Sequence, residues 1–355
     1  MHHFGLYIHW PYCLSKCPYC DFASTRIHGD LDTLKTGYAR DIASAPEGVL
    51  TSLYFGGGTP SLMPVDFLDF LMTKIHQKWT IDKNAEITLE ANPDAIDLKK
   101  MKAFNKIGIN RLSVGVQSLN DAHLRFLGRR HSVQTALNCV VQAQSIFPRV
   151  NMDLMYALPH QSLKDWEKEL QQALKLGLTH YSLYQLTIEE GTVFYKLHQK
   201  TCSDIQARRL YTLTDEIMNT TGLPAYEVSN YAHPGFESQH NMLYWTGKDY
   251  IGIGPAAAGR VLGYATQNAR SVGAWLKQAG EKEKLSPGQI RMEHLLMGLR
   301  LRRQFYPARN INPQAIAQAQ QKGWLIQNDQ GIQPTLRGTL MLNQLILMLA
   351  QSLPA

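Results

Sequence analysis

The chain has 355 residues, of which 44% are hydrophobic and 18% are charged. This composition is typical of a folded globular protein and excludes a disordered or fibrous one. The formal net charge is +7. The lysines and arginines are dispersed, however, and no RNA-binding fingerprint is present, so we expect no nucleic-acid partner.

No segment of the sequence is long and apolar enough to cross a bilayer. The longest apolar stretch, 340–349, is too short and is interrupted by Asn343 and Gln344. The first seven residues contain no Lys or Arg and no long apolar run, which is unlike a secretory signal. We therefore expect a cytoplasmic protein whose thiols stay reduced.

Strand-like runs alternate with longer helix-like stretches along the first half of the chain. The predicted strands are 5–10, 52–55, 86–90, 111–116, 150–155 and 181–186, and the predicted helices are 31–45, 64–78, 98–107, 121–127, 133–144 and 163–176. Such repeats predict an α/β fold in which right-handed crossovers join parallel strands. Six units favour a partial (β/α)6 barrel, similar to a TIM barrel, over a closed barrel of eight units.

Three of the five cysteines lie within eight residues, at Cys13, Cys17 and Cys20, just after the first predicted strand. Iron–sulfur clusters are held by cysteine thiolates, normally four of them, so three would leave one iron open. A structural zinc site is the alternative, with His9 or His28 as fourth ligand. A disulfide framework is disfavoured because the chain is long and its cysteine count is odd.

Further chemical signals follow the other predicted strands. A Gly-rich loop at 56–59 follows the second strand, Glu90 ends the third, Gln117 follows the fourth, and Asp153 lies in the fifth. Active sites of α/β barrels lie at the carboxyl ends of the strands. The pattern therefore predicts one site on this rim, next to the cysteines.

The second half of the chain reads differently. Residues 226–260 are rich in Tyr, Asn, His and Gly and show little helical pattern. A helical segment is expected from Ile290, followed by a hairpin around 328–330 and a final helix, which predicts a small winged-helix-like domain. We divide the chain into a barrel at 1–220, a flanking segment at 221–285 and a helical C-terminal domain at 286–355.

The loop at 9–22 closely resembles the signature of the radical S-adenosylmethionine (SAM) proteins, in which an aromatic residue, here Tyr19, precedes the last cysteine. The resemblance implies a [4Fe–4S] cluster on the three cysteines, SAM at the open iron, and an external electron donor. It also implies cleavage of SAM to methionine and a 5′-deoxyadenosyl radical, which abstracts hydrogen from a substrate.

The same resemblance assigns the SAM contacts: Tyr7, Tyr19, Gly57, Gly58, Thr59, Glu90, Gln117, Arg129 and Asp153. The glycine loop would receive the methionine amino group, and Arg129 would suit the carboxylate. Glu90 would accept hydrogen bonds from the ribose hydroxyls or an amine. The structural alternatives are a tight turn for the glycine loop and a solvated helix-end cation for Arg129 or Arg130.

Over nearly its whole length the chain resembles the group of oxygen-independent coproporphyrinogen III oxidases. The true oxidases carry a fourth cysteine two positions after the third, where this chain has Phe22, and a longer N-terminal segment. Both departures point to the heme chaperones of the HemW type. Their His-Asn-x-x-Tyr-Trp pattern is present from His240 to Trp245, and it implies that His240 binds heme beside the flat rings of Tyr244 and Trp245. The alternative is a structural loop.

Four residues depart from the chaperone pattern. Ala256 and Ala258 stand where relatives usually have Gly and His, and Ala157 and His160 stand where glycines are usual. These departures lie outside the predicted SAM contacts and concern the substrate pocket.

The resemblance implies a heme chaperone that binds a [4Fe–4S] cluster and SAM and passes heme to respiratory hemoproteins. Its expected partners are heme or a porphyrin, an electron donor, a heme-accepting respiratory protein and the inner membrane as a peripheral contact. The first alternative is an enzyme, a coproporphyrinogen dehydrogenase-type oxidoreductase that forms protoporphyrinogen IX. A zinc protein with a nucleic-acid partner is the second.

Overall fold

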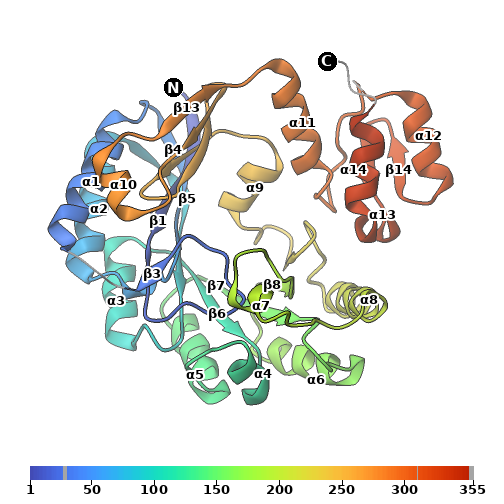
Figure 1. The fold of residues 1–355 in the computed structure, drawn as a ribbon, viewed down its shortest axis with the longest axis horizontal. Coiled ribbons are helices and arrows are strands. Elements are labelled where there is room, and N and C mark those ends of the chain that lie inside the picture. The colour runs from blue at the N-terminus through green and yellow to red at the C-terminus, as the bar shows by residue number, and fades with distance from the viewer. Residues whose placement is uncertain (27–29, 310, 352–355) are drawn as a thin grey trace.

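The computed structural model describes residues 1–26, 30–309 and 311–351. Its centre is a curved sheet of eleven strands in the order β13-β12-β11-β10-β1-β4-β5-β6-β7-β8-β9 (Figure 1). Its middle consists of six parallel strands: β1 (His3–Trp10), β4 (Val49–Gly57), β5 (Thr80–Ala91), β6 (Arg111–Gln117), β7 (Arg149–Tyr156) and β8 (His180–Gln185). All six were predicted, although β5 begins earlier than its sequence pattern indicated.

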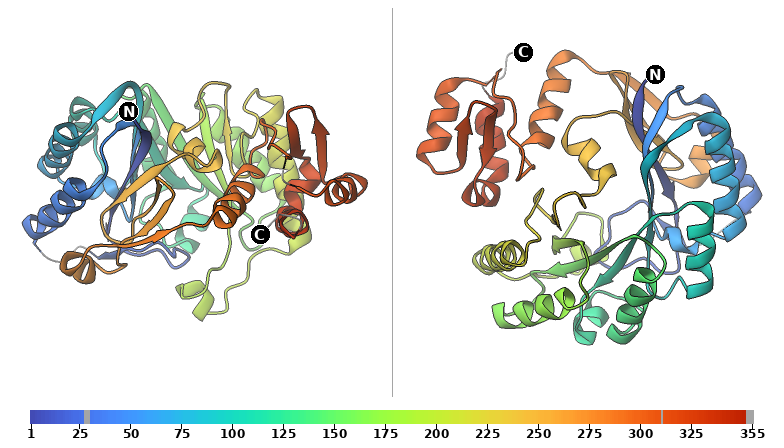
Figure 2. Two further views of the ribbon diagram at one scale, coloured as in Figure 1. Left: turned by 90° about the horizontal axis from the view of Figure 1, so that it is seen from above. Right: turned by 180° about the vertical axis from the view of Figure 1, so that it is seen from behind.

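Helices cover the convex face of this sheet, as Figures 1 and 2 show. They are α1 (Leu31–Ser44), α2 (Val65–Lys78), α3 (Leu98–Ile107), α4 (Asp121–Phe126), α5 (Val133–Gln144) and α6 (Leu163–Leu174). Side-chain caps fix where several begin, such as Ser162, which forms a reciprocal capping box with Asp165 at α6. The six predicted helices are therefore confirmed.

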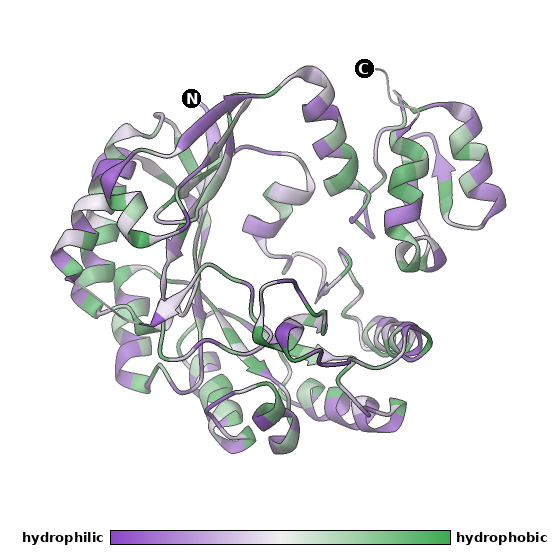
Figure 3. Cartoon of the chain, in the orientation of Figure 1, coloured by the Kyte–Doolittle hydropathy of each residue, from purple (hydrophilic) through white to green (hydrophobic). Residues whose placement is uncertain are grey.

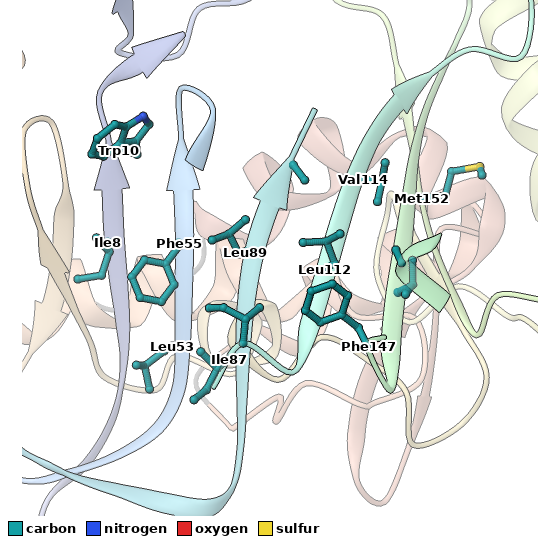
Figure 4. Close-up of a cluster of buried hydrophobic side chains, with 14 of the residues drawn as sticks. Ile8, Trp10, Leu53, Phe55, Ile87, Leu89, Leu112, Val114, Phe147 and Met152 are labelled. Carbon is teal, nitrogen blue, oxygen red and sulfur yellow. The ribbon is translucent and has the colours of Figure 1, made fainter. Parts of the chain in front are cut away.

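The two faces of the sheet differ in polarity. Side chains that point toward the helices are apolar and buried, and Figure 4 shows ten of them: Ile8, Trp10, Leu53, Phe55, Ile87, Leu89, Leu112, Val114, Phe147 and Met152. The alternate positions carry polar groups such as Ser52, Tyr54 and Glu90. Strands of sheets that are covered on both faces normally consist of continuous apolar runs. The polar residues on the concave face therefore indicate that this face is not packed against a layer of helices.

The sheet is extended at both edges and stays open. β10 (Tyr250–Ile253) pairs with β1 in parallel, and the antiparallel strands β11 (Ala258–Val261), β12 (Tyr264–Gln267) and β13 (Glu281–Lys284) follow. β9 (Asn230–Ala232) pairs antiparallel with β8 at the other edge. Among the described strands none joins β13 to β9. The partial barrel is thus confirmed, and the closed barrel of eight units is wrong.

A short helix lies in the opening between the two edges (Figure 1). This helix, α9 (Gln239–Trp245), contacts β1, β4 and β5. Because residues 226–260 lack a helical pattern, the sequence did not predict it. The helix α8 (Asp204–Thr220) was also missed, and so were the shorter α7 (Val193–Lys196) and α10 (Val272–Lys277).

The C-terminal part has a hydrophobic core of its own. It consists of α11 (Pro287–Gly298), α12 (Pro313–Gln321), the hairpin of β14 (Leu325–Asn328) and β15 (Gly331–Pro334), α13 (Leu336–Leu340) and α14 (Leu342–Ala350). Apolar residues gather on the inner side of α14 (Figure 3), where Leu345 and Leu349 are fully buried. The predicted hairpin and final helix are confirmed. No helix in the described ranges is long and apolar enough to span a membrane.

Candidate cofactor site

The loop that carries the three cysteines is folded back onto the glycine loop. Its short strand β2 (Tyr12–Cys13) pairs with β3 (Thr25–Arg26). The backbone N–H groups of Gly58 and Thr59 donate to the carbonyls of Trp10 and Tyr12, at 2.7 and 2.8 Å. A Cβ atom at Gly58 would lie 2.6 Å from the Tyr12 carbonyl oxygen and 3.1 Å from the Cys13 Sγ. Only glycine allows this approach, so the two loops form one structure.

All three cysteines line one cavity of about 360 Å³ at the carboxyl ends of the parallel strands. The Thr59 hydroxyl donates to the Cys13 Sγ at 3.4 Å, and an Arg129 N–H donates to the Cys17 Sγ at 3.5 Å. Burial raises the pKa of the Cys20 thiol to about 11. Metal binding would deprotonate it.

The arrangement of the thiols fits a cluster better than a single ion. In the described part of the chain, no three His, Cys, Asp or Glu side chains converge tightly enough to hold one metal ion. Zinc needs four such ligands around one point. His9 already bonds Tyr7 through Nδ1 at 3.0 Å and the Ala23 carbonyl through Nε2 at 2.8 Å, and His28 lies outside the described residues. Cysteines on one cavity wall suit a cluster, which spreads its irons over several thiolates.

Arg129 is fixed within the cavity wall. Its guanidinium donates to the Asn92 Oδ1 at 2.6 Å and to the Gly115 carbonyl at 2.9 Å. The Asn92 amide in turn donates to the Thr59 hydroxyl at 3.2 Å, which leads to Cys13. Arg129 is therefore not the solvated helix-end cation of the structural alternative. Its exposed neighbour Arg130, which pairs with Asp94 at 3.6 Å, fits that description.

Two carboxyl groups face the same cavity. The Tyr54 hydroxyl donates to the Glu90 Oε1 at 2.8 Å. Burial raises the pKa of Glu90 to about 7, against the lowering effect of that hydrogen bond. Burial also raises the pKa of Asp153, which accepts hydrogen bonds from Asn151 at 2.7 Å and from Ser113 at 3.3 Å. These carboxyl groups stand ready to accept hydrogen bonds from a ligand.

The remaining predicted contacts fall into two cavities. Tyr19, Gly57, Gly58, Thr59 and Gln117 line the cysteine cavity. Tyr7 instead lines a second cavity of about 610 Å³, together with His9, Arg270 and Ala256. Gly57, Glu90 and Phe22 line both cavities. The second cavity therefore opens beside the first, with Phe22 exposed between them.

Backbone geometry explains what the departures from the glycine pattern cost. Ala157, His160 and Ala256 have φ angles of 62°, 62° and 59°, in the left-handed region that favours glycine. Each has a conformation that a glycine would adopt freely and that strains a residue with a side chain. Ala258 lies in β11 with no such constraint.

His240 lies apart from both cavities described so far. It is 1% exposed. Its Nδ1 bonds the Ser52 hydroxyl at 2.8 Å, and its Nε2 bonds the Tyr244 hydroxyl at 2.7 Å. Burial lowers its pKa to about 3, so the ring is neutral. The motif is thus helical, and its histidine is enclosed.

Sequence reasoning missed several residues that line or build the cysteine cavity: Tyr54, Ser113, Asn151 and Tyr184. Their signal was weak, because each is an ordinary polar residue. They occupy inward positions of β4, β6, β7 and β8. The alternation of apolar and polar residues along those strands could have found them.

Comparisons with known proteins agree with this geometry. Residues 7–173 match the model of the radical SAM superfamily. The chain is 34% identical to the heme chaperone HemW of Buchnera aphidicola subsp. Schizaphis graminum, over 96% of this chain and 97% of the relative. It is 35% identical to the mitochondrial radical SAM domain-containing protein 1 of Danio rerio, over 96% of this chain and 86% of the relative.

A solved structure shows the same fold over nearly the full length. Coproporphyrinogen III oxidase (HemN) from Escherichia coli, a radical SAM enzyme, superimposes with a TM-score of 0.83 and covers 99% of this chain and 91% of its own. The two sequences are 19% identical. This likeness confirms the predicted α/β partial-barrel architecture.

Proposed function

The chain belongs to the HemW family of heme chaperones within the radical SAM superfamily, and from this premise we propose that it holds heme for transfer to respiratory hemoproteins while carrying a [4Fe–4S] cluster and SAM. The observation that carries the proposal is the match to a heme chaperone along the full length of both chains. Phe22, at the position where the oxidases have a fourth cysteine, supports the same branch.

Different residues of the cysteine cavity would bind the cluster and SAM. Cys13, Cys17 and Cys20 would hold the cluster, which when bound supplies an electron-transfer centre with one iron open to SAM. Arg129 orients two of these thiols, Cys17 directly and Cys13 through Asn92 and Thr59. These bonds hold Arg129 beside the cysteines and link it to the glycine loop.

The strand ends would bind SAM. Gly57 and Gly58 expose backbone groups to the cavity, and Glu90 and Asp153 present acceptors for the amine and hydroxyl groups of SAM. Gln117 has a φ angle of 70° at the end of β6, which turns the chain at the cavity wall. The protein thus positions SAM and limits its contact with water.

One observation favours the enzymatic alternative. The cavity of about 610 Å³ shares Gly57 and Glu90 with the cysteine cavity, so a substrate held there would lie next to SAM. A coproporphyrinogen oxidase would need this adjacency, because bound SAM would supply the chemistry that acts on the substrate. We keep oxidative decarboxylation as the second candidate function.

A paired assay on anaerobically reconstituted protein separates the two functions. Heme is added to one sample and its retention through gel filtration is followed by absorption. Coproporphyrinogen III, SAM and a reductant are added to the other. We expect retained heme and no porphyrinogen turnover, with iron and sulfide in the protein. Turnover without heme retention would establish the oxidase, and bound zinc without iron would reject both functions.

We also propose where this chain delivers heme and which surface it contacts there. A cytoplasmic chaperone would meet respiratory proteins at the inner face of the membrane, and a net charge of +7 suits a peripheral contact with anionic lipid. Sedimentation with vesicles of anionic or neutral lipid tests this contact. Binding that is equal for both vesicles would contradict an electrostatic attraction.

A further inference from the structure

A third cavity lies at the carboxyl end of the motif helix, one turn beyond His240. Its volume is about 260 Å³, and it is bounded by the carboxyl end of α9, by β10 to β12 and by α11. Tyr244 connects the two places, since its hydroxyl bonds His240 while its ring lines this cavity. The motif therefore reaches the cavity through Tyr244 and not through its histidine.

The lining of this cavity suits a flat apolar ligand. Tyr244, Tyr250 and Tyr264 supply aromatic rings, and Leu285 and Ile290 supply aliphatic surface. The rings of Tyr244 and Tyr250 pack edge to face, with centroids 4.5 Å apart. Such surfaces bind macrocycles by contact and exclusion of water.

The cavity also has groups that can bind iron. His294 is an exposed residue of α11, and Met297 follows it one turn later on the same wall. The His294 ring packs on Gly247, where a Cβ atom would lie 2.6 Å from Cδ2 and 2.7 Å from Nε2. Gly247 has a φ of 64°, so a glycine is favoured at this turn. Histidine and methionine both serve as axial ligands of heme iron.

Cationic groups stand at the rim. Lys248 is exposed at the mouth, and Arg260 is held by Glu293 through three hydrogen bonds of 2.9 Å. Carboxylates of a bound ligand would find a lysine ammonium that the described residues leave without an ion pair. The cavity thus combines aromatic surface, groups that can bind iron and one lysine without an ion pair in the described ranges, while its two carboxylates, Asp249 and Glu293, pair with His2 and Arg260.

We propose that this cavity binds one edge of heme, with His294 as the iron ligand and the ring of Tyr244 against the macrocycle. This inference rests on the proposed function and names its cargo site. At about 260 Å³ the cavity is smaller than fully enclosing ligand sites. The rest of the macrocycle stays exposed, as transfer to a recipient requires.

Titration of the full chain with hemin tests the site. His294→Ala removes the iron ligand from the surface of α11, where it has little effect on folding. We expect heme affinity to fall roughly 10–100-fold, as for the loss of a metal-site contact. His294→Met keeps an axial ligand, so it should restore part of the affinity and shift the absorption band. A merely structural histidine would give no such spectral change.

Controls separate this inference from the proposed function. His76→Ala removes an exposed histidine of α2, a helix that Figure 1 shows across the sheet from α11, and this variant should bind heme like the unmodified chain. Tyr244→Phe keeps the ring and should retain most of the affinity. If the unmodified chain binds heme and His294→Ala binds it equally well, the site is wrong while the chaperone function stands. If the unmodified chain retains no heme, the function itself is wrong.

Discussion

Glu90 is the residue whose ionisation the site controls most clearly. Its pKa, raised by burial from 4.5 to about 7, means that the folded chain holds a proton that the unfolded chain releases above pH 4.5. Its contribution to stability is fully present below that value. It is lost as the pH rises through 7, because the carboxylate must then be buried charged.

We therefore predict that Glu90→Gln stabilises the cofactor-free chain at pH 8 and changes little at pH 4.5. The difference in the free energy of unfolding should be on the order of 1–2 kcal/mol. This is below the ~1.4 kcal/mol per pKa unit of a fully buried group, because the side chain is partly exposed. Urea unfolding at both pH values measures it. Glu47→Gln, a change on the exposed surface, should show no such dependence.

The sequence was enough to predict the positions of some site residues in the structure but not those of others. The cysteines, the glycine loop, Glu90 and Asp153 were identifiable because each follows, ends or lies within a strand with a clear pattern. Tyr7 was assigned to SAM, yet it lines the neighbouring cavity. His240 is enclosed by two hydrogen bonds from Ser52 and Tyr244, which are 188 and 4 residues away. A sequence motif identifies a residue, but it does not show which other residues bury its side chain.

At the scale of elements, α9 depends on one buried carboxylate. Glu86 is 3% exposed and accepts hydrogen bonds from the Gln239 N–H at 3.0 Å and the Ser238 hydroxyl at 3.3 Å. It also faces Arg149 at 3.0 Å and Arg111 at 3.6 Å. These contacts tie the start of the helix to β5, β6 and β7. They explain why a sequence without helical periodicity is helical here.

We predict that Glu86→Gln lowers the free energy of unfolding by about 3–5 kcal/mol. The change leaves the buried Arg111 without its compensating charge, and breaking such a pair is costly. Thermal and urea unfolding measure the loss. Glu47→Gln breaks the exposed pair with Lys78 and should cost less than about 1 kcal/mol. Equal effects of the two changes would show that Glu86 is not a structural anchor.

Helices and strands were predictable where the sequence pattern of a segment agrees with the structure that its packing favours. The six βα units alternate clearly, and caps such as Asp97 and Ser132 mark where helices begin. The strands β10 to β13 were missed because each has only four residues, and Gly252 and Gly259 weaken their pattern. Their close approach requires glycine, since a Cβ at Gly252 would lie 2.1 Å from the Ala258 carbonyl oxygen. The need for glycine at these positions is visible only once the strands are paired in the structure.

At the scale of the whole molecule, the proposed sites for SAM and for heme are built on two different hydrophobic cores. The main core lies between the sheet and helices α1 to α6, and the second joins α11, α12, α14 and the hairpin. The cysteine cavity is built on the first core. The cavity proposed for heme takes one wall from α11, whose Leu295 belongs to the second core, as does Leu299 directly after the helix. Damage to one core should therefore leave one function intact.

We predict that Leu345→Ala weakens heme binding and spares SAM binding. Leu345 is fully buried in the second core, so its truncation should cost about 2–5 kcal/mol there and loosen α11. Leu112→Ala makes the same change in the main core, within β6, the strand that ends at Gln117, and should weaken SAM binding instead. Calorimetric titration with SAM and absorption titration with hemin measure both variants. If each change reduced both affinities alike, the chain would unfold as one unit, and the boundary predicted at residue 286 would be wrong.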